Sequence, residues 1–199
     1  ESIDLERPEA LRGCGIIAIV APFEALPADH VAQLSSAVQS GAAMLLVVPP
    51  EIDPERRGLR PHGLDQLATL AWTQLDEAIA VEGDPTLRKS DGMGLTFEAT
   101  LAAHTSTAQI HDFAVEDHGG EPRILVSMGR PLVRRAEQGR APEALLSSGP
   151  RSFAMHDIGG FLATRAEPTR GTSDRAGPLD LALAAELPAG PSTPGKPLR

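Results

Sequence analysis

The sequence has few cysteines, no long apolar runs and a deficit of basic residues, which argues against several kinds of functional site. A single cysteine, Cys14, excludes an internal disulfide and any zinc site built from cysteines. Apolar runs stay far shorter than the roughly 18–20 residues that a membrane-spanning helix needs. Basic residues number 18 against 27 acidic ones, which gives a formal net charge of −9. This balance argues against nucleic acid as the main partner, because phosphate contact requires a basic surface.

The motifs that mark cofactor sites and hydrolases are also missing. There is no GxGxxG or Walker-type glycine loop of the kind that cradles nucleotide phosphates at the start of a helix. There is no Gly-x-Ser-x-Gly nucleophile motif and no His-Glu-x-x-His zinc motif. We therefore expect no cofactor, no metal and no catalytic residues.

A strand–helix–strand pattern occupies residues 15–50 and gives the clearest indication of the fold. Its outer segments, 16–22 and 44–50, open with unbroken apolar runs, which are typical of strands covered on both faces in a parallel sheet. Pro27 suits the first turn of the intervening helix, and Gly41 suits its end. The apolar stripe of that helix is formed by Val31, Leu34 and Val38.

Later segments predict a mixture of helices, strands and loops. We expect an amphipathic helix over residues 64–75 and a short helix over 97–104. Strands are predicted at 78–81, 109–116, 123–128 and 179–187, with a hairpin formed by 109–116 and 123–128 around a turn that contains Gly119 and Gly120. The remaining segments are predicted as a surface loop at 54–61, a helical turn at 143–146, an interrupted strand at 153–164 and a Pro/Gly-rich linker or tail at 188–199.

These elements predict one α/β domain over residues 1–187, with three layers, a mostly parallel sheet and one β-hairpin. Ligands of such sheets bind beyond the carboxyl ends of the parallel strands. At these ends prolines remove N–H donors and acidic side chains add negative charge, so we expect an interaction surface there instead of a phosphate or catalytic site. Its candidate residues are Pro22, Phe23, Pro49, Pro50 and Glu51.

Two groups of residues invite a catalytic interpretation that their positions disfavour. Cys14 lies between two glycines, as in a nucleophile elbow, but it precedes its strand where an elbow nucleophile follows one. His156 and Asp157, with Asp174 or Asp180, have the chemistry of an acid/base group. Turn chemistry in front of a strand explains residues 174–178 without catalysis.

Three histidines recur every seven residues, at His104, His111 and His118, with acidic residues among them. Such groups are metal ligands in many proteins. In a strand, however, this spacing alternates between faces and separates the outer histidines by more than about 20 Å. We expect these residues to be solvated loop and edge residues.

Several short motifs, taken in order, resemble the soluble domain of GldG-type auxiliary proteins of uncharacterised or gliding-motility ABC transport systems. They lie in a strand ending in Ala21-Pro22, a helix start at Leu26-Pro27, a Ser40-Gly41 turn and a second strand. They continue in Arg130-Pro131-Leu132, in Leu145-Leu146-Ser147-Ser148 with Ser152-Phe153, and in Gly177-Pro178-Leu179-Asp180-Leu181-Ala182. Together they span most of residues 2–187.

This resemblance implies a Rossmann-like domain with the architecture of class I glutamine amidotransferases but without their catalytic residues. It also implies a periplasmic or other extracytoplasmic location, partnership with ABC permease and ATPase subunits, and membrane anchoring through segments absent from this chain. The function expected is therefore that of a non-catalytic auxiliary or interaction domain.

Two alternatives on the same scaffold remain open: an amidotransferase-like hydrolase and a solute-binding domain. The hydrolase requires a nucleophile, a base and an oxyanion donor within hydrogen-bond reach of one another. The solute-binding domain requires a deep pocket with a few convergent polar groups. An interaction domain instead predicts an apolar or proline-rich surface patch.

Overall fold

The computed structural model describes residues 4–7, 10–22, 24–89, 92–112, 122–137 and 140–187. The first part of the chain forms β1 (Ile16–Val20), α1 (Ala28–Gln39), β2 (Ala43–Val47), β3 (Ile52–Asp53), β4 (Gly58–Leu59) and α2 (Asp65–Leu70). The middle part forms β5 (Thr73–Leu75), β6 (Ile79–Val81), β7 (Thr96–Leu101), β8 (Arg123–Ser127), β9 (Leu132–Arg134) and β10 (Glu143–Ser147). The last part forms β11 (Phe153–Met155), α4 (Ile158–Thr164), β12 (Arg175–Ala176) and β13 (Asp180–Ala184).

The predicted strand–helix–strand unit is confirmed. β1 and β2 pair in parallel, with Ile17 opposite Met44 and Ile19 opposite Leu46, and α1 is the crossover between them. Pro27 caps the start of α1, and Gly41 takes a positive φ of 112° just after its end. The apolar stripe of α1 is buried as its spacing predicts, at Val31, Leu34 and Val38.

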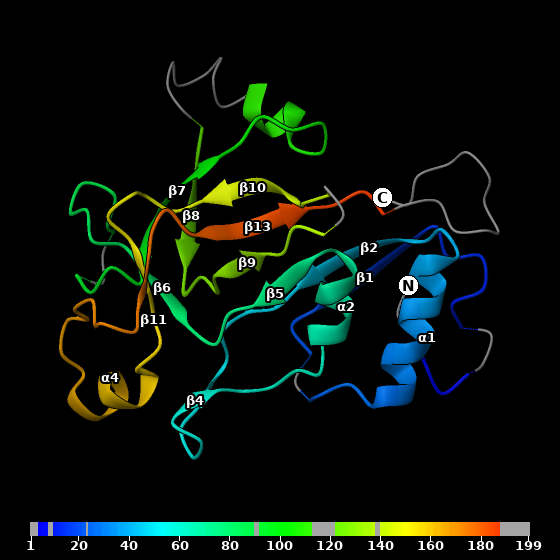
Figure 1. Cartoon of the computed structure of the whole chain (residues 1–199), viewed down its shortest axis with the longest axis horizontal. Coiled ribbons are helices and arrows are strands. Elements are labelled where there is room, and N and C mark those ends of the chain that lie inside the picture. The colour runs from blue at the N-terminus through cyan, green and yellow to red at the C-terminus, as the bar shows by residue number, and fades with distance from the viewer. Residues whose placement is uncertain are drawn as a thin grey trace.

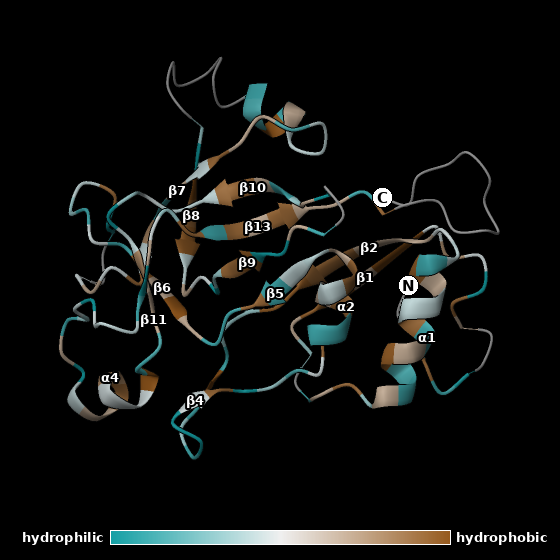
Figure 2. Ribbon diagram, in the orientation of Figure 1, coloured by the Kyte–Doolittle hydropathy of each residue, from teal (hydrophilic) through white to brown (hydrophobic). Residues whose placement is uncertain are grey.

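The expectation that both faces of these strands are covered is wrong. One face packs against α1 and α2 in a core that contains Ile17, Leu34 and Leu67. The opposite face carries large apolar side chains that remain exposed, by 74% at Ile16 and 62% at Val20. We call this surface the open face; it consists of Ile16, Ala18, Val20, Leu45 and Val47. Figure 2 shows that both strands are hydrophobic along their length. An unbroken apolar run predicts burial of both faces, but here the side chains of one face are exposed.

The predicted fold class, a three-layer Rossmann-like domain with a mostly parallel sheet, is also wrong. The largest sheet has six strands in the order β5-β9-β13-β10-β7-β8, and all of its pairings are antiparallel. A second antiparallel sheet has the order β12-β11-β6, and β3 and β4 form a small hairpin. Within the described ranges, parallel pairing is confined to β1 and β2. Parallel strands need long crossovers, and between α2 and α4 the described chain is helical only at residues 108–112.

Several local predictions fail for related reasons. Residues 96–101 form β7, not part of a helix, and bury Phe97, Ala99 and Leu101 at alternate positions. The predicted partner of β8 at 109–116 is helical as far as residue 112, and β8 pairs with β7 instead. Residues 113–121, which include the predicted turn, lie outside the described residues.

Other boundaries also move. The second predicted helix ends at Leu70 and is followed by strand β5. Residues 143–147 form strand β10 where a helical turn was expected, and the predicted strand over 153–164 divides into β11 and α4. The side chain of Asp157 accepts a hydrogen bond from the N–H of Gly160 and thereby caps α4, which explains why a glycine pair here begins a helix.

The two antiparallel sheets meet around a second core. Phe97 and Ala99 of β7 pack with Ala80 of β6, Ala154 of β11 and the buried Leu179. A third cluster joins β4, β6, β11 and α4 through Leu59, Ile79, Met155 and Ile158. In Figure 1 this region and the strand–helix–strand unit lie at opposite sides of the molecule, with β5 and β9 between them.

The predicted tail, 188–199, lies outside the described residues. None of the helices within the described ranges combines the length and apolar character needed to cross a membrane.

Paired substitutions on β1 test whether only one of its faces is buried. We expect Ile17→Thr to lower the free energy of unfolding by about 2–4 kcal/mol, because it removes buried methyl groups and buries a hydroxyl. Ile16→Thr, one residue away on the open face, is expected to change it by no more than about 0.5 kcal/mol. Urea unfolding of the two variants measures both values, and equal losses would contradict one-sided burial.

Candidate functional site

Of the predicted interaction residues, Pro22 follows β1, and Pro49, Pro50 and Glu51 follow β2. The strands run in parallel, and the N–H of Ala21 donates to the carbonyl of Val47 at 2.9 Å, so both ends lie at one edge. Pro22 and Pro49 are half-buried there, and Pro50 is buried. Phe23 lies outside the described residues. These prolines therefore pack into the protein and contribute little to its surface.

Glu51 is also engaged within the chain. Its carboxylate pairs with the guanidinium of Arg60 at 2.8 Å, and its carbonyl accepts the backbone N–H of Arg60 at 2.7 Å. This places Glu51 in the base of the β3–β4 hairpin. Its predicted role as an interaction residue stays a prediction.

His62 is a residue of this edge that the sequence did not single out. Its side chain is buried, and its Nδ1 lies 3.0 Å from the carbonyl oxygen of Pro22. A carbonyl only accepts, so Nδ1 carries a proton and donates it to Pro22. Nε2 is buried without a hydrogen-bond partner. The ring fastens the end of β1 to the segment that leads into α2, where the N–H of Leu26 also donates to the carbonyl of His62.

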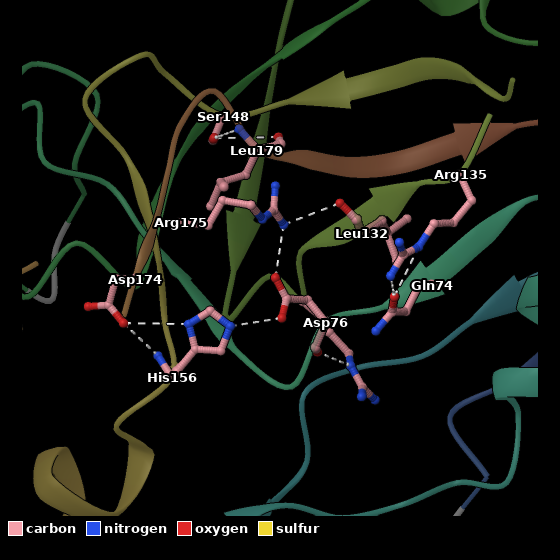
Figure 3. Close-up of polar contacts among 10 residues, drawn as sticks. Gln74, Asp76, Leu132, Arg135, Ser148, His156, Asp174, Arg175 and Leu179 are labelled. Atoms are coloured by element: carbon pink, nitrogen blue, oxygen red, sulfur yellow. Dashed lines mark hydrogen bonds and ion pairs between the residues drawn. The ribbon is translucent and has the colours of Figure 1, made fainter. Parts of the chain in front are cut away.

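A second group of polar residues lies where the two antiparallel sheets meet, and Figure 3 shows it in close-up. Asp76 follows β5, His156 follows β11, Asp174 precedes β12, and Arg175 belongs to β12. We call these four residues the His156 cluster. The sequence proposed His156 with Asp174 as a possible pair, and the structure brings them together. It separates the other two candidates, since Asp157 caps α4 and Asp180 pairs with Arg134 at 2.8 Å.

Every carboxylate and ring nitrogen in the His156 cluster has a partner. Nε2 of His156 lies 3.0 Å from Asp76 Oδ1, and Nδ1 lies 3.5 Å from Asp174 Oδ1. The other oxygen of Asp76 accepts from Arg175 Nη2 at 2.9 Å, and the other oxygen of Asp174 accepts from the N–H of Gly171 at 2.7 Å. The two aspartate side chains are 12% and 6% exposed and that of His156 is 34% exposed, so the carboxylates are shielded from water and the ring is only partly so.

This arrangement is suited to fastening, not to proton transfer. A catalytic imidazole uses one nitrogen for an orienting carboxylate and keeps the other for its substrate or nucleophile. In His156 both nitrogens face carboxylates, and within the described part of the chain no hydroxyl or thiol hydrogen-bonds the ring. The cluster instead links β12 to the end of β5 through Arg175 and Asp76, and to β9 because Arg175 also donates to the carbonyl of Leu132.

A buried polar group next to this junction serves the same purpose. The hydroxyls of Ser148 and Ser152 lie 2.6 Å apart, and the N–H of Leu179 donates to Ser148 Oγ at 2.8 Å. Glu82 is fully buried, and its two carboxylate oxygens accept the backbone N–H groups of Asp84 and Gly149. The buried hydroxyls and the buried carboxylate thus find their hydrogen-bond partners within the protein.

The remaining catalytic and metal candidates are dispersed. Cys14 is half-buried beside the first core, with its thiol 3.7 Å from the carbonyl of Ala10. His104 contacts Ser106 Oγ at 2.7 Å, and His111 lies beside Asp112. His118 lies outside the described residues. Among the residues that are described, no three histidine, cysteine or acidic side chains are placed to hold a metal ion.

Two carboxylates elsewhere have lowered pKa values with local causes. The hydrogen bond from Lys89 lowers the pKa of Glu98, and Arg123 adds to this effect from the neighbouring strand β8. The backbone N–H of Thr86 lowers the pKa of Asp84, and the hydroxyl of the same threonine also donates to it. Both effects favour the charged form through ordinary surface contacts.

Comparison with known proteins adds a likeness of fold. No protein-family model matches the chain, and no curated protein matches it. Among solved structures it is similar to one titled "mmIFT52 N-terminal domain", with a TM-score of 0.50 and 15% sequence identity. The likeness covers 76% of this chain, which spans 63% of that one. At this identity it concerns the fold alone, and it supports the mainly antiparallel architecture over a Rossmann-like sheet.

The fastening role of the His156 cluster predicts a loss of stability that is unrelated to activity. We expect His156→Ala to lower the free energy of unfolding by about 2 kcal/mol, because two shielded carboxylates lose their shared partner. Arg134→Gln is the matched control, since it breaks an exposed ion pair and should cost less than about 1 kcal/mol. Chemical denaturation measures both, and a loss for His156→Ala no larger than the control's would exclude this role.

The lowered pKa of Glu98 predicts a defined pH dependence. A carboxylate whose pKa falls on folding stabilises the protein above its ordinary value of 4.5, and this contribution is lost as the pH falls through the folded-state pKa. Glu98→Gln should therefore destabilise the protein by about 0.5–1 kcal/mol at pH 7. The difference from the unsubstituted protein should shrink below pH 4.5. The same substitution at exposed Glu24 is the control, and a Glu98→Gln difference independent of pH would refute the assignment.

Proposed function

We propose that this chain is a non-catalytic interaction domain of an ABC transport system, as its resemblance to GldG-type auxiliary proteins implies. In this proposal it acts on the extracytoplasmic side and is anchored to the membrane by segments outside this chain. Its partners are the permease and ATPase subunits. The observation that carries the proposal is the open face of β1 and β2.

The open face has the composition of a contact surface. Its four large side chains, Ile16, Val20, Leu45 and Val47, are 41–74% exposed. The register places Val20 beside Val47 and Ala18 beside Leu45, so the side chains are neighbours and no charged residue interrupts them. Contiguous apolar surface of this kind marks interaction sites in soluble domains. Its lack of charge suits an apolar segment of the permease.

The positions of the motif residues also support a scaffold role. Arg130 is buried, donates to the carbonyl of Asp76 at 2.8 Å and pairs with Glu77. Ser148 and Ser152, from a second motif, bond one another and contact Leu179 of a third. Motifs far apart in the sequence thus converge on the junction of the two antiparallel sheets. Their hydrogen bonds and ion pairs are made within the fold, as expected for residues that maintain a structure.

For the hydrolase alternative, the described residues offer no observation comparable to the open face. It needs an imidazole with one nitrogen available and a nucleophile within reach. The ring of His156 is occupied on both sides, and His62 is buried. His104 contacts the hydroxyl of Ser106 at 2.7 Å, but this is an exposed contact within one turn, and the same ring nitrogen also accepts the N–H of Ser106.

Co-purification of the full-length protein from membranes tests the proposal. We expect an ABC permease and ATPase, identified by mass spectrometry, to accompany the unmodified protein. Leu45→Glu should reduce their recovery at least about tenfold, because it places an unpaired charge in the contact. The fold should be retained, since the side chain points to solvent.

The control is Leu125→Glu on β8, where the leucine is 61% exposed on a different sheet. It should leave recovery unchanged. The proposal fails if neither subunit accompanies the unmodified protein, or if Leu45→Glu recovers them as well as Leu125→Glu does.

A further inference from the structure

A small hollow lies between the β3–β4 hairpin and α4, away from the open face. Its volume is about 330 Å³, at the lower end of the range for small-molecule sites. Pro54 and Arg57 line it from the hairpin, and Arg165 lies at the end of α4. The rest of its wall is formed by Gly159, Leu162 and Ala163. One hollow therefore combines two guanidinium groups with apolar side chains.

Neither arginine has an acidic partner among the described residues. The polar contact of Arg57 is with the carbonyl of Gly159, at 3.4 Å, and Arg165 uses only its backbone N–H, which donates to Phe161. Several other arginines form ion pairs, as Arg134 does with Asp180 and Arg175 with Asp76. In a chain with a net charge of −9, this hollow brings together two guanidiniums that have no acidic partner among the described residues.

The acidic residues nearest in the sequence are already engaged by the backbone. Asp53 accepts the N–H groups of Glu55 and Arg56 within the hairpin turn, at 3.0 and 3.2 Å. Asp157 accepts the N–H of Gly160 at 2.8 Å. Neither carboxylate lies within ion-pair distance of the two arginines, so both positive charges remain available.

The backbone holds both arginines in conformations that other residues would adopt at lower cost. Arg57 has a φ of 53° and Arg165 a φ of 49°, in the left-handed region that favours glycine or asparagine. Arginine adopts this conformation less readily than glycine, because its Cβ crowds the backbone there. Ala21, Trp72 and Met128 share this conformation, and Arg165 takes it as the residue that ends α4, so it locates the two side chains at the hollow without explaining them.

The absence of a side chain at Gly159 lets the hairpin approach α4. A Cβ at this position would lie 3.2 Å from the Cβ and 3.5 Å from the Nε of Arg57. The stem of Arg57 therefore lies across the start of α4, over Gly159. A side chain there would require the Cβ and the carbonyl of Arg57, at 3.2 and 3.3 Å, to shift by a few tenths of an ångström and would carry the arginine with them.

We propose that this hollow binds a phosphate monoester of a small molecule with an apolar body. Two guanidiniums supply about two positive charges, which match the charge of −1.5 to −2 on a phosphate monoester at pH 7 better than a single carboxylate. Their planar N–H groups donate to the phosphate oxygens in pairs. Leu162, Ala163 and Pro54 contact the apolar body. This site is independent of the open face and of the proposed transport role.

Titration with phenyl phosphate, followed by calorimetry and by backbone amide shifts, tests the proposal. We expect saturable binding with shifts centred on the hairpin turn and α4, and at least about tenfold weaker binding of benzoate and of inorganic phosphate. Arg57→Gln and Arg165→Gln should each weaken phenyl phosphate binding about tenfold or more.

Matched variants separate recognition from folding. Arg56→Gln removes a neighbouring exposed arginine of the same turn that does not line the hollow, and it should leave binding unchanged. Gly159→Ala should weaken binding by displacing Arg57, while circular dichroism shows α4 retained. The proposal is overturned if phenyl phosphate does not bind at millimolar concentration. It is also overturned if Arg56→Gln weakens binding as much as Arg57→Gln, or if benzoate binds equally well.

Discussion

The packing of α1 and α2 against one side of β1 and β2 is the constraint on which the functional interpretation depends. Val31 and Leu34 of α1 meet Ile17 of β1 and Leu67 of α2, each no more than 3% exposed. Both helices cover the same face, because α1 is the crossover between the two strands and α2 packs beside it. Side chains of a strand alternate between its faces, so the same register that buries Ile17 exposes Ile16. The open face is a direct consequence of this one-sided cover.

The His156 cluster and the buried serines hold the two antiparallel sheets together. Their hydrogen bonds cross between segments that are far apart in the sequence, such as Asp76 to Arg175 and Ser148 to Leu179. At this junction the polar side chains form their ion pairs and hydrogen bonds with other groups of the same molecule. The open face, in contrast, has no charged side chain, and the hollow with Arg57 and Arg165 holds two guanidiniums without an acidic partner among the described residues. They are the two surfaces on which our proposals of a partner and of a ligand rest.

Sequence reasoning succeeded where one local pattern decided the structure. The stripe of Val31, Leu34 and Val38, with Gly41 after it, specified α1 and the parallel pairing of its flanking strands. It failed where strand pairing depended on distant segments, because the local sequence of a short strand does not specify which strand pairs with it. The alternation of Phe97, Ala99 and Leu101 was a readable strand signal that the helix interpretation overlooked.

The candidate site was predictable only in part for the same reason. His156 and Asp174 are close enough in the sequence to be considered together, whereas Asp76 joins them through contacts between sheets that no local spacing encodes. The apolar run at 16–20 correctly indicated a strand, but composition alone does not say whether a second layer covers it. His62 and the pair Arg57 and Arg165 likewise acquire meaning only through the segments that fold against them.

The most direct test of the central claim is solvent paramagnetic relaxation of methyl-labelled protein with a soluble gadolinium agent. One-sided packing predicts strong relaxation for the methyl groups of Ile16, Val20 and Leu45, and protection for those of Ile17 and Leu34. Equal protection of Ile16 and Ile17 in the isolated protein would show that both faces of the strand pair are covered. That result would contradict the account.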